Sequence, residues 1–143
     1  MLTRRPRVLA AMVVLLALTG LSSAPADPPR NAADPLSKLG KERFRAAENQ
    51  YDIVWSYYQQ NRIEIYQVYF WSRLMLDARR DLGETAADRA AALKAHLERM
   101  KKLEDLVIKV RRLGFGRGYD VGASEYYRLE AEYWVARDAG KER

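Results

Sequence analysis

A hydrophobic seam runs through the middle of the chain. Its positions follow one another at alternating spacings of three and four residues: Phe44, Ala47, Tyr51, Val54, Tyr58, Asn61, Ile65, Val68, Ser72 and Met75. This heptad spacing is typical of helices that pack in coiled coils and bundles. The phase continues through Asn61 without glycine or proline, so we predict one long helix from about Leu36 to Arg80. A break near Asn61, giving two helices, is the alternative.

Two further helices are predicted after Gly83. Thr85-x-x-Asp88 resembles a capping box, and the helix behind it carries one apolar stripe: Leu93, Leu97, Met100, Leu103, Val107 and Val110. Three glycines between positions 114 and 118 end that helix. The last helix is predicted from about Asp120 to Ala139, with an inner face of Tyr126, Leu129, Tyr133 and Ala136. We therefore predict an all-α, antiparallel bundle of three helices, the first much longer than the others, or of four if the first one breaks.

The first residues predict export. Arg4, Arg5 and Arg7 precede fourteen uncharged residues, and Ala24-Pro25-Ala26 offers the small side chains that a signal peptidase accepts. A membrane-spanning helix needs about 20 apolar residues, so a cleavable signal peptide over residues 1–26 is favoured over an anchor. The arginine pair leaves the twin-arginine route open as a minor option.

This division gives three parts: a signal peptide (residues 1–26), a proline-rich spacer (27–35) and a helical bundle domain (36–143). Cleavage would remove three arginines and lower the formal charge from +6 to +3, which argues against nucleic-acid binding. The chain has no cysteine, so neither disulfides nor cysteine-based metal sites are available. We expect a periplasmic or cell-envelope protein that is stabilised by apolar burial.

The segment from Val107 to Ala136 carries a helix, a glycine turn at Gly114–Gly118 and a returning helix that opens with Asp120-Val121. This order resembles the helical hairpin tip of the TolC family of outer-membrane efflux proteins. The chain has no alternating β segments with which to build that family's membrane barrel. The resemblance therefore implies a related periplasmic coiled-coil module, and it does not imply a channel.

A degenerate first copy of this hairpin would span Tyr57 to Leu76, with Asn61-Arg62 in place of the turn glycine. A shift of 55 residues pairs several positions: Ile53 with Ile108, Arg62 with Arg117, Arg73 with Arg128, Leu74 with Leu129, and Asp77 with Glu132. Two amphipathic helices also produce such matches by chance. Duplication and coincidence both stay open on these residues.

No residue pattern indicates an enzyme, a cofactor or a metal site. His96 is the single histidine, and without a second nitrogen ligand it is best interpreted as a surface or boundary residue. The run Gly114-x-Gly116-x-Gly118 follows a helix rather than a strand, so it indicates a turn between helices and not a phosphate-binding loop. Two pairs of carboxylates lie close together in the sequence, Glu104 with Asp105 and Glu130 with Glu132. The side chains of each pair point apart on a helix, so neither pair indicates an acid/base site.

The aromatic residues indicate an interaction surface. Tyr69-Phe70-Trp71 spans about 200° of a helix at 100° per residue, more than a core-facing stripe accommodates. At least one ring should project outward, and Phe70 is favoured. Tyr and Trp outside a core are typical of contacts with proteins or with a membrane surface, so peripheral membrane contact stays open. Arg111, Arg112 and Arg117 give the glycine turn a positive charge that suits an anionic partner or the helix dipole.

Two functions follow as hypotheses. The first is an exported, non-enzymatic interaction module that binds protein partners or itself through helical seams and is related to efflux proteins. The alternative is a soluble periplasmic carrier or sensor that binds an apolar ligand between aromatic-lined helices. A filled core favours the first, and a dry aromatic cavity favours the second.

Overall fold

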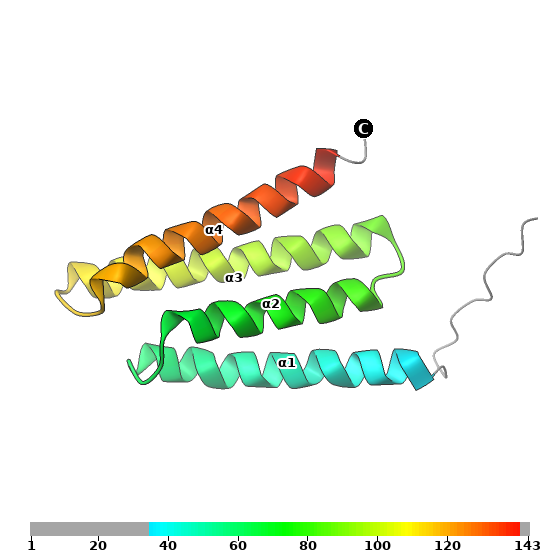
Figure 1. The fold of residues 1–143 in the computed structure, drawn as a ribbon, viewed down its shortest axis with the longest axis horizontal. Coiled ribbons are helices and arrows are strands. Elements are labelled where there is room, and N and C mark those ends of the chain that lie inside the picture. Colours follow the sequence, from blue (N-terminus) through cyan, green and yellow to red (C-terminus); the bar gives the residue numbers. More distant parts are fainter. Residues whose placement is uncertain (1–34, 141–143) are drawn as a thin grey trace, which may run out of the picture.

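The computed structural model describes residues 35–140, which form four helices and no strand (Figure 1). They are α1 (Pro35–Gln59), α2 (Ile65–Leu82), α3 (Ala86–Arg112) and α4 (Gly118–Ala139). Consecutive helices run antiparallel, and the α1–α2 and α3–α4 turns lie at the same end of the bundle. The all-α bundle is confirmed. The count of three helices is wrong, and the four-helix alternative holds. The predicted signal peptide and spacer residues 27–34 lie outside the described residues.

The break between α1 and α2 falls at Asn61. Its φ of 56° lies in the left-handed region, which asparagine tolerates better than most residues. The Arg62 N–H donates to the Tyr57 carbonyl at 2.9 Å, and the Asn61 N–H donates to the Tyr58 carbonyl at 2.8 Å. These two bonds form a Schellman motif, which satisfies the last carbonyls of a helix as the chain leaves it.

The predicted seam is real on both sides of this turn. Every seam position from Phe44 to Met75 is buried or half-buried except Asn61, which is exposed. Because the turn preserves the spacing of three and four, the hydrophobic pattern continues although the chain reverses. The periodicity therefore predicted which residues face the core, but it did not predict that the chain reverses at Asn61.

The α3–α4 turn repeats the same backbone geometry 53 positions later. Phe115 N–H donates to the Val110 carbonyl, and Gly114 N–H donates to the Arg111 carbonyl, with Gly114 at φ 81°. Gly114 thus stands where Asn61 stands in the first turn. The turn geometry therefore repeats at a shift of 53 residues, whereas the residue matches in the sequence occur at a shift of 55.

The α2–α3 connection shows the predicted capping box. The Asp88 N–H donates to the Thr85 hydroxyl, and the Thr85 N–H donates to the Asp88 carboxylate, both at 3.1 Å. The Thr85 hydroxyl, which donates to the Asp88 carboxylate at 2.7 Å, and the Thr85 N–H hold the pKa of this carboxyl below its ordinary value. The box satisfies two N–H groups at the start of α3 and fixes the point at which the second hairpin begins.

The core lies where the two hairpins meet. Val68 on α2 is fully buried, as are Met100 and Leu103 on α3. The α2 helix packs against each of the other three helices. Among the described residues, no Cα atom of α1 lies within 8 Å of a Cα atom of α3 or α4. In Figure 1, α1 lies at one edge and α4 crosses α3 on the other side.

The predicted inner face of α4 is wrong. Tyr126, Leu129, Tyr133 and Ala136 are all exposed. The helix packs through its opposite side, where Ser124 and Ala131 are buried and Tyr127, Trp134 and Val135 are half-buried. Small side chains on the packed side allow close approach of the helices, since the distance between helix axes depends on the residues at the contact.

Candidate functional site

An array of aromatic rings crosses from α2 to α4. Phe70 lies 5.9 Å from Tyr66 and Tyr66 lies 6.3 Å from Tyr69, measured between ring centroids. Tyr69 stacks on Tyr127 of α4 at 4.1 Å, and Tyr127 lies 6.1 Å from Tyr126. We call these five rings the aromatic surface. Tyr126 and Tyr66 are 60% and 52% exposed, and Phe70 is 37% exposed, so the surface is open to solvent at both ends.

The predicted triplet Tyr69-Phe70-Trp71 divides between three environments. Tyr69 faces α4, and Trp71 is half-buried against the core. Phe70 lies between them, in T-shaped contact with Trp71 at 5.6 Å, and is the most exposed of the three. The structure therefore places Phe70 outward, as the spacing indicated.

Tyr69 is the fixed centre of the surface. Its hydroxyl donates to the Glu130 carboxylate at 2.6 Å, a length typical of charge-assisted bonds. Burial raises the pKa of the Tyr69 hydroxyl above its ordinary value, and the hydrogen bond to Glu130 raises it further. The hydroxyl therefore stays protonated at neutral pH and acts as a positioning donor rather than as a base.

Exposed side chains of α4 continue the surface along that helix. Tyr119 and Tyr133 are each 61% exposed, and Leu129 is 48% exposed. Tyr66 and Tyr127 were not among the predicted interface residues, and Tyr126, Leu129 and Tyr133 of α4 were predicted on the inner face of the helix. Their spacing of three and four residues was the available signal, but it does not state which neighbour a seam faces.

The three predicted arginines gather at the turn end of the bundle. Arg117 forms an ion pair with Glu64 at 2.6 Å, which joins the residue before α4 to the residue before α2. Tyr119 also donates to Glu64, at 2.7 Å. Arg111 and Arg112 are exposed. Among the described residues, no hydrogen bond, ion pair or cation–π contact joins these arginines to Tyr69-Phe70-Trp71.

A groove of about 290 Å³ lies beside these turns. Its lining includes the apolar side chains of Leu106, Val107, Val110 and Phe115, with Arg111, Arg117 and Asp120. The Tyr58 hydroxyl donates to Oδ2 of Asp120 at 2.9 Å, while the buried Oδ1 of Asp120 has no hydrogen-bond partner among residues 35–140. Burial and this bond raise the pKa of Tyr58. The groove thus combines apolar side chains with two arginines and one buried carboxylate.

His96 is fully buried, so its prediction as a surface or boundary residue is wrong. Its Nδ1 lies 2.8 Å from the Ser72 hydroxyl, which also accepts from Nε of Arg99 at 2.7 Å. The ring stacks on Trp134 at 5.6 Å, and Arg73 lies 4.0 Å from the Trp134 ring centroid. His96 therefore joins the two hairpins. Its partner Ser72 was visible in the sequence as a polar residue on the seam.

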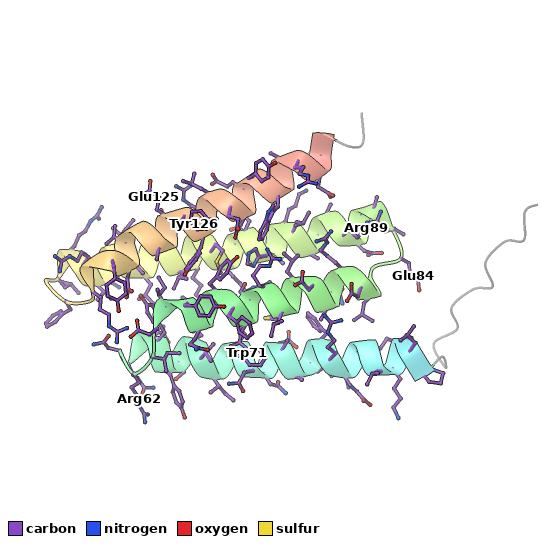
Figure 2. All side chains as sticks on the ribbon, in the orientation of Figure 1. Arg62, Trp71, Glu84, Arg89, Glu125 and Tyr126 are labelled. Atoms are coloured by element: carbon purple, nitrogen blue, oxygen red, sulfur yellow. The ribbon has the colours of Figure 1, made fainter. Side chains whose placement is uncertain are left out.

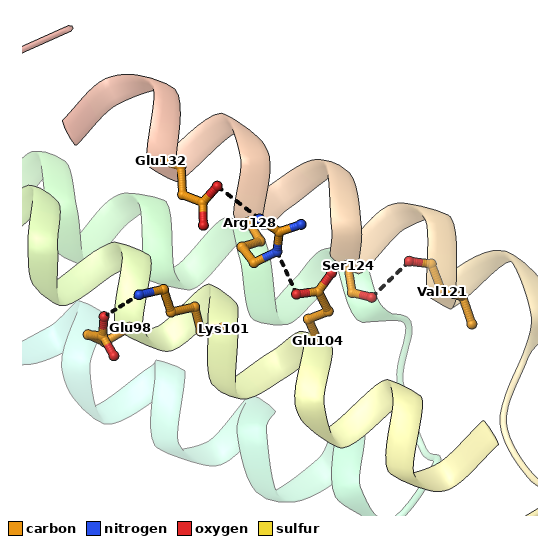
Figure 3. A network of polar contacts seen from close by, with 7 residues as sticks. All are labelled: Glu98, Lys101, Glu104, Val121, Ser124, Arg128 and Glu132. Atoms are coloured by element: carbon orange, nitrogen blue, oxygen red, sulfur yellow. Dashed lines mark hydrogen bonds and ion pairs between the residues drawn. The ribbon is translucent and has the colours of Figure 1, made fainter. Parts of the chain in front are cut away.

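An ion-pair network ties α4 to α3 (Figure 3). Nε of Arg128 lies 2.6 Å from Glu104 of α3, and Nη1 lies 2.9 Å from Glu132. These hydrogen bonds raise the pKa of Arg128. Glu104 and Glu132, which belong to two different carboxylate pairs in the sequence, thus serve as partners of one arginine on the packed side of α4.

The described residues contain no group of three or more His, Cys, Asp or Glu side chains that could hold a metal ion. None of their helices combines the length and the apolarity needed to cross a membrane. No family model, curated protein or solved structure matches the chain. Figure 2 shows all side chains on the ribbon and labels Tyr126, which lies at the α4 end of the aromatic surface.

Proposed function

We propose that the chain is an exported, non-enzymatic interaction module of the cell envelope that binds protein partners through the aromatic surface. The observation that carries this proposal is the continuous contact from Phe70 to Tyr126, whose end rings are open to water. Exposed apolar patches on a small protein usually mark interaction sites. Tyrosine is also enriched among the residues that dominate binding energy.

The surface is built to be rigid. Tyr69 is held by Glu130 and by stacking on Tyr127, so the outer rings rest on fixed neighbours. A rigid contact surface loses little conformational entropy when a partner binds. Side chains that served only the core would not need this support at the solvent boundary.

The proposed relation to efflux proteins rests on the hairpin between Val107 and Ala136. Two hairpins with the same turn geometry, at Asn61 and Gly114, support a duplicated hairpin module. We propose a periplasmic place of action on the N-terminal pattern of charged, apolar and small residues.

Phe70→Ala tests the proposal. We expect the free energy of unfolding to fall by less than about 1.5 kcal/mol, because the ring is partly exposed, while binding to envelope proteins is lost. Denaturant unfolding and affinity capture from an envelope extract measure the two effects. Met100→Ala is the core control and should cost about 2–5 kcal/mol.

Tyr57→Ala is the matched surface control, since Tyr57 is 41% exposed on α1 and lies outside the aromatic surface. It should leave capture unchanged. If Phe70→Ala unfolds the protein as Met100→Ala does, or if capture persists at wild-type level, Phe70 belongs to the core or to an inert surface and the proposal fails.

One observation favours the carrier as a second function. A groove of about 480 Å³ lies between α1 and α3, over α2, and its lining includes Phe44, Met75 and Leu76. That volume falls in the range of small-molecule sites. Saturable binding of an apolar fluorescent probe, abolished when Ala95 in this groove is replaced by Trp, would favour the carrier over the interaction module.

A further inference from the structure

The outer face of α4 carries a complete heptad seam that faces solvent. Its six positions follow spacings of three and four residues, and all are exposed: Tyr119, Gly122, Tyr126, Leu129, Tyr133 and Ala136. The opposite side of the helix already holds the core contacts, through Ser124 and Ala131. We call the six positions the outer seam. An apolar heptad seam is the pattern that pairs two helices, and this one lacks a helix partner among the described residues.

We propose that the outer seam pairs with the outer seam of a second copy of this chain, with the two α4 helices antiparallel. This inference rests on the proposed function and names one partner for the α4 end of the aromatic surface. The register places a two-fold axis between Tyr126 and Leu129. Such an isologous pair is closed and is the commonest form of homo-oligomer.

Side-chain sizes favour the antiparallel register. It sets Tyr119 against Ala136 of the second copy, Tyr133 against Gly122, and Tyr126 against Leu129, so each large ring faces a smaller residue. Large residues opposite small ones interdigitate and fill the space between helices. A Cβ built on Gly122 meets nothing within 4 Å, which leaves room there for the partner ring.

The parallel register is worse on the same residues. It sets each tyrosine against its own copy and Gly122 against Gly122, which crowds some layers and leaves others empty. Cavities and overpacking both destabilise an interface packed like a core. The sequence of small and large residues along α4 therefore specifies direction as well as pairing.

The area of the outer seam predicts a weak dimer. A tyrosine offers about 150–250 Å², so three tyrosines about 60% exposed and one half-exposed leucine offer roughly 400–500 Å² per copy. Two copies together approach roughly 1,000 Å², just below the range of about 1,200–2,000 Å² for stable interfaces. The flanking side chains add the remainder, so we expect a dimer that depends on protein concentration.

Charge opposes the pair mildly. In the antiparallel register Glu125 flanks the seam next to Glu132 of the second copy. Glu132 is already paired with Arg128 at 2.9 Å, which reduces the repulsion. Glu125→Lys would replace this like-charge contact by an attractive one on each side of the axis. It should tighten the dimer several-fold at low salt, with the gain screened at high salt.

Cysteine crosslinking tests the pairing and its direction, because the chain has no cysteine of its own. Gly122→Cys and Tyr133→Cys variants of the full chain are oxidised separately and as a mixture. A disulfide needs Cα atoms about 4.4–6.8 Å apart, so the antiparallel register predicts covalent heterodimer in the mixture and little product from either variant alone. Ile53→Cys, on the exposed face of α1, replaces Tyr133→Cys in the control mixture and should give only background product.

Each outcome is decisive. Product from Gly122→Cys alone would show parallel pairing and overturn the register. Background yield in every mixture, with a monomer in sedimentation at several hundred micromolar, would overturn self-pairing and leave the seam to a different protein. In that case loss of envelope-protein capture in Phe70→Ala would still support the proposed function. Heterodimer without any capture effect of Phe70→Ala would support the dimer and sink the wider proposal.

Discussion

At the scale of single residues, His96 stands out as a titratable side chain that is fully buried between the two hairpins. Burial and, to a smaller extent, the nearby guanidinium groups of Arg99 and Arg73 together lower the pKa of its imidazole to about 3. Its Nδ1 lies within hydrogen-bond distance of the Ser72 hydroxyl, and its buried Nε2 has no hydrogen-bond partner in the part of the chain that the structure describes. A neutral ring tolerates this position, whereas a charged one would be buried beside two other cations.

The stability of the protein should therefore fall in mild acid. The folded-state pKa of about 3 lies below the ordinary 6.5, so the unfolded chain binds the extra proton between these pH values. The contribution of neutral His96 to the free energy of unfolding is fully present above about pH 7. It decreases as pH falls through 6.5, by about 2 kcal/mol between pH 7 and pH 5. Denaturant titrations at several pH values measure it. His96→Gln should be less stable at pH 7 but should lose this slope, and an unchanged slope would refute the assignment.

Asn61 and Gly114, the equivalent turn residues with positive φ, should respond in the same direction to substitution by alanine. Gly114→Ala brings a Cβ into the left-handed region, which costs about 1–2 kcal/mol. Asn61→Ala replaces a residue that already has a Cβ there, so it should also destabilise but by less, because it loses only the preference of asparagine for this region. Gly122→Ala is the matched control: it lies within α4 with open space around it and should stabilise the monomer by roughly 0.5–1 kcal/mol. Thermal unfolding at low protein concentration measures all three, and a stabilising Asn61→Ala would contradict the Schellman turn.

At the scale of helices, the sequence predicted which side chains are buried better than it predicted where one helix ends and the next begins. The stripe of α3 from Leu93 to Val107 is buried as predicted, and so is the seam on both sides of Asn61. The turn at Asn61 was predicted only as the alternative, because asparagine also occurs within helices. Gly114 indicated the equivalent turn directly, because glycine adopts positive φ without a steric cost. The start of α3 was predicted correctly because the groups of the Thr85 capping box lie within four residues of one another in the sequence.

The failure at α4 has a different physical cause. This helix has apolar positions on two sides, and the sequence pattern of large residues selected the side with Tyr126, Leu129 and Tyr133. Packing selected the side with small residues, because Ser124 and Ala131 let α4 lie close to its neighbours while Arg128 reaches Glu104. Tyr66 and Tyr127 join the aromatic surface only through this choice, so the surface could not be assembled from periodicity alone.

At the scale of the whole molecule, the four helices are not equally supported. The α2 helix packs against all three others and contributes Ser72 and Val68 to the buried contacts between hairpins. The α1 helix packs along α2 alone, apart from side-chain contacts such as Arg99 over the Tyr51 ring. Within positions 35–46 of α1 no side chain is buried, although Arg43 pairs with Asp81 at the surface.

This difference predicts the order in which the backbone opens. Regions with few buried contacts exchange amide hydrogens through local opening, and core helices exchange only through larger unfolding events. We expect the amides of residues 38–46 to exchange fastest among the helix interiors, and those around Ser72, Met100 and Leu103 to exchange slowest. Exposed ion pairs contribute little, so Arg43→Ala should leave this order unchanged. Hydrogen exchange read by mass spectrometry measures it. Equal protection of α1 and α3 would mean that the first helix unfolds only together with the core, and that the bundle opens as one unit.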